Sequence, residues 1–322
     1  MNRFFIGFFI AIMAMFLCFS SCKKENVYKP KKQIARVLSS TNSANKQMQQ
    51  AMTWDDKKLQ KIDHYYNGSI SWTEYYTYDK KNRICKVDDY GNNETVEYKY
   101  DGKNLKSIDW TKNGKLRESI NVTYKGNKIS RLEYIEYDYK KSTEANEEKH
   151  LSLIPEIVEK SGNTPKATFY YDHQTLTIDI EWDGDNIAKT IYNRVLSGEY
   201  YNGEIYAPGT KTENTVSTYT YDKNTNPIYG FRDGYYILQP DVYTSRIMAC
   251  YSKNNLTQMT EAWTMSIVTS NQTISDSDIN TYNYSYTYDK EFMTGKYPTE
   301  VLYTHTYNGN TTMSTTYYEY NN

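Results

Sequence analysis

The amino-acid sequence predicts an all-β protein: a long antiparallel β-meander of repeated hairpins, strongly curved or closed into a soluble barrel. Three observations predict this fold. A short phrase recurs along the chain, made of an aromatic residue, an Asp, two or three turn-forming residues and an aliphatic residue. Ahead of the Asp, aromatic and polar residues alternate, which is the period of a β-strand with one packed face. Tyr, which favours strands, supplies 36 of the 322 residues.

The N-terminus predicts a targeting segment and a lipid anchor. Arg3 precedes an almost unbroken apolar stretch, 4–19, which is somewhat short for a bilayer span of about 20 residues. The run Phe-Ser-Ser-Cys at 19–22 resembles the lipobox of bacterial lipoproteins, in which the cysteine, here Cys22, is lipid-modified. We therefore expect a signal peptide over 1–21 and an outer-membrane lipid-anchored protein that faces the periplasm or the cell surface. An ordinary secretory signal and an uncleaved membrane anchor are the alternatives.

The residues after the anchor predict a tether and one large domain. The stretch 22–52 is polar, holds several Lys and shows no useful periodicity, so we expect a flexible linker there. The repeats begin at Trp54, and we expect a single β-meander domain over 53–322.

Each repeat predicts a β-hairpin. Its clearest copy is Tyr-Asp-Gly-Lys-Asn-Leu at 100–105, in which the Asp caps the turn and the Gly or Asn adopts positive φ. Two apolar positions three residues apart, such as Leu105 and Ile108, predict either a bulge or a return strand covered on both faces. Eight to ten such units imply on the order of 16 to 18 strands. Aromatic-Asp pairs begin at Trp54, Tyr78, Tyr100, Tyr137, Tyr171, Trp182, Tyr221 and Tyr288.

Three insertions interrupt the repeats. The first, 140–166, is polar and could hold a short helix over 143–153. The second, 199–213, and the third, 226–240, are expected to be loops that carry aromatic residues. A transmembrane barrel is disfavoured, because its lipid face would need an apolar band on strand after strand, whereas these strands carry Tyr on one face and Lys, Glu, Thr and Asn on the other.

The phrases at 76–84 and 98–105 resemble the YD repeats of Rhs and teneurin proteins. The chain is more similar to a family of uncharacterised Bacteroidota-type surface lipoproteins with degenerate YD-like repeats. In that family a Tyr-Asp strand, here at Tyr221, leads into an Asn-Pro segment, here at Asn226, and then a Ser-Lys-Asn-Asn-aliphatic turn, here 252–256. The resemblance covers roughly 52–322 and implies a porin-like barrel shape. It implies no activity.

The sequence carries no catalytic, cofactor or metal motif, so we expect a non-enzymatic protein without a cofactor. The four histidines, His64, His150, His173 and His305, stand at no metal-ligand spacing. Acidic runs such as 183–186 and 276–278 are better explained by turns than by calcium. The formal net charge of −1 gives no electrostatic basis for binding nucleic acid. Nothing predicts an oligomeric state.

Two cysteines remain in the predicted domain, Cys85 and Cys250. Two separately buried thiols are the expectation, and a disulfide between them is the alternative in an oxidising compartment.

Any ligand site is expected where insertions interrupt the repeat. Loops carry function more often than the scaffold that holds them, and aromatic side chains suit sugars or peptides. We therefore predict a protein that binds a glycan or peptide through its loops or the mouth of the barrel, with a structural or protein-interaction scaffold as the alternative. The candidate residues are Tyr200, Tyr201, Tyr206, Phe231, Tyr235 and Tyr236.

Overall fold

The computed structural model describes residues 30, 32–40, 45–137, 154–161, 164–202, 206–229, 251–288, 297–307 and 310–321. Within these ranges the chain forms seventeen β-strands in one antiparallel sheet. The first nine are β1 (Ile34–Ser40), β2 (Gln47–Asp55), β3 (Lys58–Tyr66), β4 (Ser69–Tyr78), β5 (Ile84–Asp89), β6 (Glu94–Asp101), β7 (Asn104–Lys112), β8 (Lys115–Lys125) and β9 (Lys128–Glu136). The others are β10 (Ile154–Ser161), β11 (Thr164–Asp183), β12 (Asn186–Tyr201), β13 (Tyr206–Thr225), β14 (Asn254–Thr269), β15 (Thr273–Tyr288), β16 (Pro298–Tyr307) and β17 (Asn310–Tyr320).

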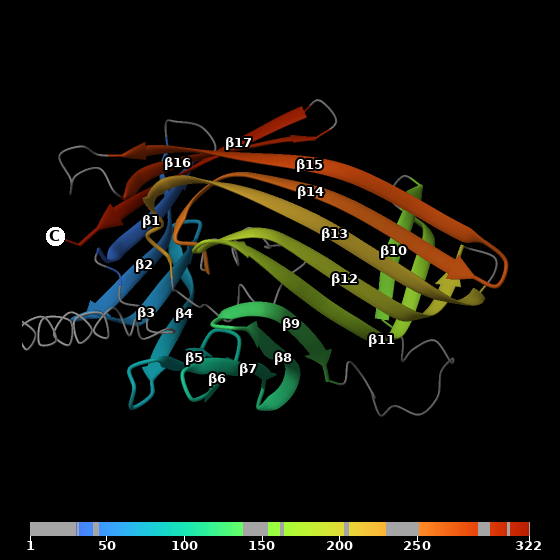
Figure 1. Cartoon of the computed structure of the whole chain (residues 1–322), viewed down its shortest axis with the longest axis horizontal. Coiled ribbons are helices and arrows are strands. Elements are labelled where there is room, and N and C mark those ends of the chain that lie inside the picture. The colour runs from blue at the N-terminus through green and yellow to red at the C-terminus, as the bar shows by residue number, and fades with distance from the viewer. Residues whose placement is uncertain are drawn as a thin grey trace, which may run out of the picture.

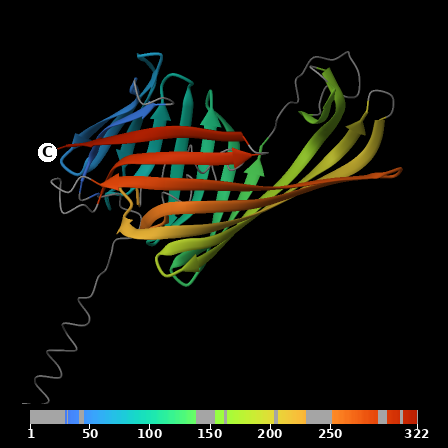
Figure 2. The same ribbon diagram turned by 90° about the horizontal axis from the view of Figure 1, so that it is seen from above.

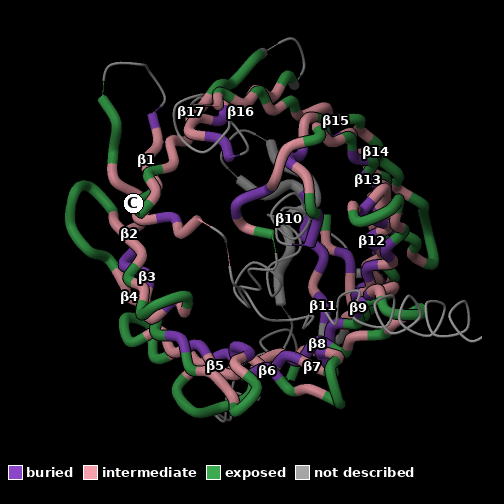
Figure 3. Tube along the Cα trace, turned by 60° about the vertical axis from the view of Figure 1, so that its left-hand side comes forward, coloured by how far each residue is buried: buried purple, intermediate pink, exposed green. Residues whose placement is uncertain are grey.

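The sheet closes into a barrel, which confirms the predicted fold class. Strand β1 pairs with both β2 and β17, and β9 pairs with β11, so the ring passes through every described strand except β10. Strand β10 pairs with the first part of β11, ahead of the segment that β9 pairs with. Figure 3 looks into the ring. Closure pairs most of the strand edges that so long a sheet would otherwise leave exposed.

Strands β11–β15 are much longer than the rest. They contain 16–20 residues, whereas the other described strands contain 6–11. These long strands therefore extend past the rest of the barrel on one side (Figures 1 and 2).

The predicted bulge is present in the hairpin units. In the hairpin of β6 and β7, Tyr100 pairs with Leu105 but Lys99 pairs with Ser107, so Lys106 is an extra residue. Both apolar residues that flank the bulge, Leu105 and Ile108, are fully buried. The extra residue lets a three-residue step keep both side chains on the same face of the sheet. Equivalent extra residues are Gln60, Cys85, Ser130, Ala188, Thr257 and Thr299.

The aromatic residue at the end of the first strand of a hairpin forms a hydrogen bond with the preceding hairpin. Tyr100 shows the arrangement: its hydroxyl donates to the carbonyl oxygen of Ile84, 2.7 Å away, in the previous hairpin. Arg83, beside Ile84, also spans the two units, since it binds the Asp79 carboxylate and donates to the carbonyl of Gly102. Similar bonds of 2.7–2.9 Å to backbone carbonyls come from Trp54, Tyr78, Trp182, Tyr221, Tyr286 and Tyr320.

The core lies on the inner face of the barrel, the face that closure can shield from water. One apolar cluster extends from β3 to β14 near the Asp-containing turns, with Leu59, Ile108 and Ile187 fully buried. A second cluster, with Phe169 and Leu196 at its centre, lies in the far part of the long strands. In the described ranges, no helix is long and apolar enough to cross a membrane.

Several predicted boundaries were wrong. Strand β1 and most of β2 lie inside the predicted tether, 22–52, because their backbones complete the barrel between β3 and β17. Strand β10 and the start of β11 lie inside the predicted insertion 140–166, and the helix considered over 143–153 lies outside the described residues. The predicted loop 199–213 is mostly strand, since β12 and β13 pair from Tyr201 and Tyr206 onward.

Candidate ligand site on the inner wall of the barrel

Of the predicted ligand residues, the structure describes the side chains of Tyr200 and Tyr201. Tyr200 is 4% exposed and packs in the second core cluster, so the expectation that packing does not require it was wrong. Tyr201 ends β12 and is half-buried, and it pairs in register with Tyr206 at the start of β13. Phe231, Tyr235 and Tyr236 lie outside the described residues, as does Cys22.

The inner wall changes character around the ring. On β3–β9, inner positions are largely aliphatic and buried, as Ile62 and Ile120 illustrate. On β15 and β16, the inner positions carry Tyr282, Tyr284 and Tyr303, which stay half-buried. Their side is fixed by register, because residues directly opposite each other share a face and Tyr282 lies opposite the buried Met259.

Three tyrosines and a histidine form a strip across β15 and β16, which we call the tyrosine strip: Tyr282, Tyr284, Tyr303 and His305. The Tyr282 ring stacks on His305, with centroids 4.4 Å apart and planes 14° apart. Tyr303 is 5.5 Å from Tyr284 and 6.2 Å from Tyr282, centroid to centroid. Rings at such spacings offer continuous aromatic surface with polar edges.

Polar groups border the tyrosine strip. Asn280 Oδ1 lies 3.2 Å from Nε2 of His305. Glu261, on β14, lies opposite Asn280, and the hydroxyl of Ser217 donates to it over 3.5 Å. Burial raises the pKa of the Tyr282 hydroxyl, and the neighbouring Glu261 carboxylate raises it further. Aromatic surface beside a few directed polar groups is the usual composition of a small-ligand site.

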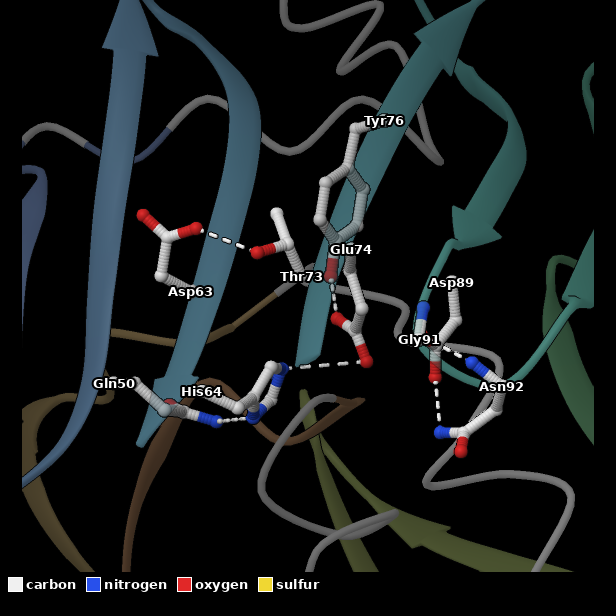
Figure 4. Close-up of polar contacts among 9 residues, drawn as sticks. All are labelled: Gln50, Asp63, His64, Thr73, Glu74, Tyr76, Asp89, Gly91 and Asn92. Carbon is white, nitrogen blue, oxygen red and sulfur yellow. Dashed lines mark hydrogen bonds and ion pairs between the residues drawn. The ribbon is translucent and has the colours of Figure 1, made fainter. Parts of the chain in front are cut away.

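A second histidine stack, on β3 and β4, is buried. His64 on β3 stacks on Trp72 of β4, with centroids 4.3 Å apart. Glu74 lies 3.4 Å from His64 Nε2 and accepts a 2.6 Å hydrogen bond from Tyr76, and the side chains converge as Figure 4 shows. His64 and Glu74 are 7% and 4% exposed, so this group is part of the packed wall.

Other candidate features have structural explanations. Asp276 and Asp278 accept hydrogen bonds from the backbone N–H groups of Ser277 and Ile279. Clusters of three or more His, Cys, Asp or Glu that could hold a metal are absent from the described ranges. Cys85 occupies an extra bulge position as a free, partly exposed thiol, so its expected burial was wrong, and Cys250 lies outside the described residues.

A polar hollow of about 360 Å³ lies on the outer face of β13–β15, away from the tyrosine strip. Small side chains such as Thr264, Ser266 and Ser275 line it. Its lining residues include no aromatic side chain.

Little in the amino-acid sequence indicated the tyrosine strip. Tyr282 and Tyr284 belong to a period-two run that predicts a packed sheet face, which is where they lie. Their partners Tyr303 and His305 come from the next strand, and Glu261 comes from the preceding one. Only the pairing of three strands brings these side chains together.

No family model matches the chain, and no curated protein sequence matches it. Among solved structures, the chain is similar to the crystal structure of a porin-like protein from Bacteroides uniformis ATCC 8492. The similarity covers 89% of this chain and 98% of that one, at 12% sequence identity and a TM-score of 0.28. A TM-score that low carries no argument about function.

Proposed function

We propose that the protein is a non-enzymatic, lipid-anchored protein of the cell envelope or surface that binds a glycan or peptide inside its barrel. One observation carries the binding proposal: on β15 and β16, three inner-facing tyrosines and a histidine stack into one continuous, partly exposed aromatic strip. Partly exposed tyrosines on a rigid sheet provide a preformed contact surface at low entropic cost.

Ligand binding is tested with the full-length protein against panels of glycans and envelope-derived peptides. Replacing Tyr303 with Ala removes the central ring of the strip, and we expect affinity for any bound ligand to fall about tenfold or more. Tyr75→Ala is the matched control, because Tyr75 is 45% exposed on the outer face. Equal loss in both variants, or no ligand across all panels, would contradict the proposal.

The anchor proposal has support in the position of the N-terminal segment. Gln33, just ahead of β1, accepts a 2.9 Å hydrogen bond from Asn321 N–H and donates to the carbonyl of Asp56. The segment therefore enters the barrel at the end that carries the Asp-containing turns. A lipid on Cys22 would hold that end toward the membrane. Fatty-acid labelling tests this: we expect Cys22→Ala to abolish labelling and release the protein from membranes, and retained labelling would refute it.

A second function, a protein-interaction scaffold, is favoured by apolar side chains at the opposite end. Tyr66 is 71% and Tyr90 is 73% exposed at successive turns, β3–β4 and β5–β6, and Leu116 is 38% exposed just after the β7–β8 turn. Aromatic tips clustered on one rim are typical of interaction surfaces. A photo-crosslinking residue at position 90 should then capture one defined protein in cells, whereas the same residue at the Asp-turn position Lys103 should not. Identical patterns at both positions would exclude this function.

A further inference from the structure

The tyrosine strip lies on a wall of unusual charge. Strands β14–β17 contain no Lys and no Arg, but they contain five carboxylates: Glu261, Asp276, Asp278, Glu300 and Glu319. The opposite wall differs because it carries both charge signs: β2–β9 hold nine Lys and two Arg beside twelve Asp and Glu. A wall of one charge sign sets the sign of the charge that it attracts.

The inner-facing cations on β12 and β13 nearest to the tyrosine strip form ion pairs with Glu213. Lys211 lies 2.9 Å and Arg194 lies 3.2 Å from the Glu213 carboxylate oxygens. Both ion pairs are largely buried, which holds these cations in place. Glu261 and Asp278 share the inner face on the next two strands and bring negative charge to the border of the strip.

Glu261 is placed to act together with the rings. It lies next to the Tyr282 hydroxyl, whose pKa is raised first by burial and then by this carboxylate, and the pKa of Tyr303 is raised by the same two causes. The faces of tyrosine rings are themselves electron-rich and attract cations. A carboxylate beside aromatic faces is the arrangement that recognises an ammonium group, through a charge-assisted hydrogen bond and cation–π attraction.

We propose, on the basis of the function proposed above, that the tyrosine strip binds an amino sugar whose free ammonium group pairs with Glu261 and whose ring packs on Tyr282 and Tyr303. The flat C–H face of a sugar ring matches the extended aromatic surface, and its hydroxyls match Asn280 and His305. The ammonium group of a lysine side chain could also pair with Glu261. A lysine side chain has no hydroxyls to bond with Asn280 and His305, so we favour the amino sugar over a lysine-containing peptide.

The test uses three probes with the full-length protein: a glucosamine oligosaccharide, its fully N-acetylated counterpart and a tri-lysine peptide. Binding is measured by calorimetry at a pH at which the amines are protonated, and by the fluorescence of Trp263, two residues from Glu261. We expect the free amino sugar to bind at least tenfold more tightly than the acetylated one, and the peptide to bind more weakly than the amino sugar.

Glu261→Gln removes the charge and keeps the shape. We expect it to lower affinity for the amino sugar about tenfold, about 1.4 kcal/mol, and to leave the acetylated sugar unaffected. Glu300→Gln, on the outer face of β16, is the matched control and should change the affinity for neither sugar. Thermal melting of each variant shows whether the barrel is intact, and Tyr303→Leu, which weakens both sugars, supplies a second readout.

Each outcome decides between the claims. Equal binding of both sugars, unchanged in Glu261→Gln, would overturn the ammonium inference and leave the proposed ligand-binding function standing. Tighter binding of tri-lysine than of the amino sugar would overturn the sugar assignment. Absence of binding by all three probes would overturn this inference, and the wider glycan and peptide panels would then decide the proposed function itself.

Discussion

Replacing Tyr100 with Phe tests whether the hydrogen bond between neighbouring repeat units stabilises the fold. The variant keeps the ring, which lies 3.8 Å from the guanidinium carbon of Arg83, and removes only the hydroxyl that donates to the Ile84 carbonyl over 2.7 Å. Ile84 is 4% exposed, so water replaces the lost donor poorly. Leaving a buried acceptor without its partner costs about 1–3 kcal/mol.

We expect a loss near the lower half of that range, about 1–2 kcal/mol, because a carbonyl oxygen can keep a second hydrogen bond. For a domain of this size each kcal/mol lowers the melting midpoint by about 2–4 °C. Urea unfolding, followed by both tyrosine–tryptophan fluorescence and far-ultraviolet circular dichroism, measures the change, and coincident curves are required for the comparison.

Two further variants make the result decisive. Tyr66→Phe is the control, since Tyr66 is 71% exposed and its change should stay within about 0.5 kcal/mol. Tyr78→Phe removes the equivalent bond to Leu59, 2.9 Å long, and should cost a similar amount as Tyr100→Phe. If Tyr100→Phe and Tyr78→Phe unfold like Tyr66→Phe, the bonds between units contribute nothing and our reading of the repeat is wrong.

Two other predictions concern acid stability and the sheet edge. Burial would raise the pKa of Asp79, but hydrogen bonds and charge from Arg83 outweigh it and hold the pKa below its usual value. This stabilisation is complete above the unfolded pKa of about 3.9 and is lost as pH falls through the lower folded pKa. Urea unfolding should therefore show a smaller loss of stability between about pH 6 and pH 3 in Asp79→Asn than in the wild type, and an equal loss would contradict the assignment. In the described structure, 273–280 of β15 pairs only with β14, and the carboxylates of Asp276 and Asp278 cover two backbone N–H groups there. Changing both residues to Ala should expose the edge and promote self-association, which light scattering measures. Asn at both positions should leave the association state the same as in the wild type.

The sequence by itself determined the hairpin unit. Its turn, bulge and strand faces depend on residues within about ten positions of one another, such as Tyr100, Gly102 and Leu105, so local chemistry is sufficient. Gly102 and Asn82 adopt φ of 57° and 61° at turns where the pattern requires a residue tolerant of positive φ. The repeat count also predicted the approximate number of strands, because each unit supplies two.

Only the tertiary structure decided where the barrel closes. Strand β1 pairs with β17, and Lys32 reaches the carbonyl of Asn321 from 289 residues away. The sequence of β1 carries no repeat phrase, so its strand character depends on two neighbours that are themselves far apart in the chain. For the same reason the polar segment ahead of Trp54 was predicted as a tether.

The tertiary structure also decided which aromatic residues are accessible. Tyr200 was predicted to lie in a loop and is core, because Phe169 and Ile267 arrive beside it from other strands. Tyr282 belongs to a period-two run that predicts a sheet face, and it lies half-buried on the inner wall, packed at the margin of the apolar cluster that contains Met259. Exposure depends on the strands that come together around a side chain, and a linear pattern does not contain that information.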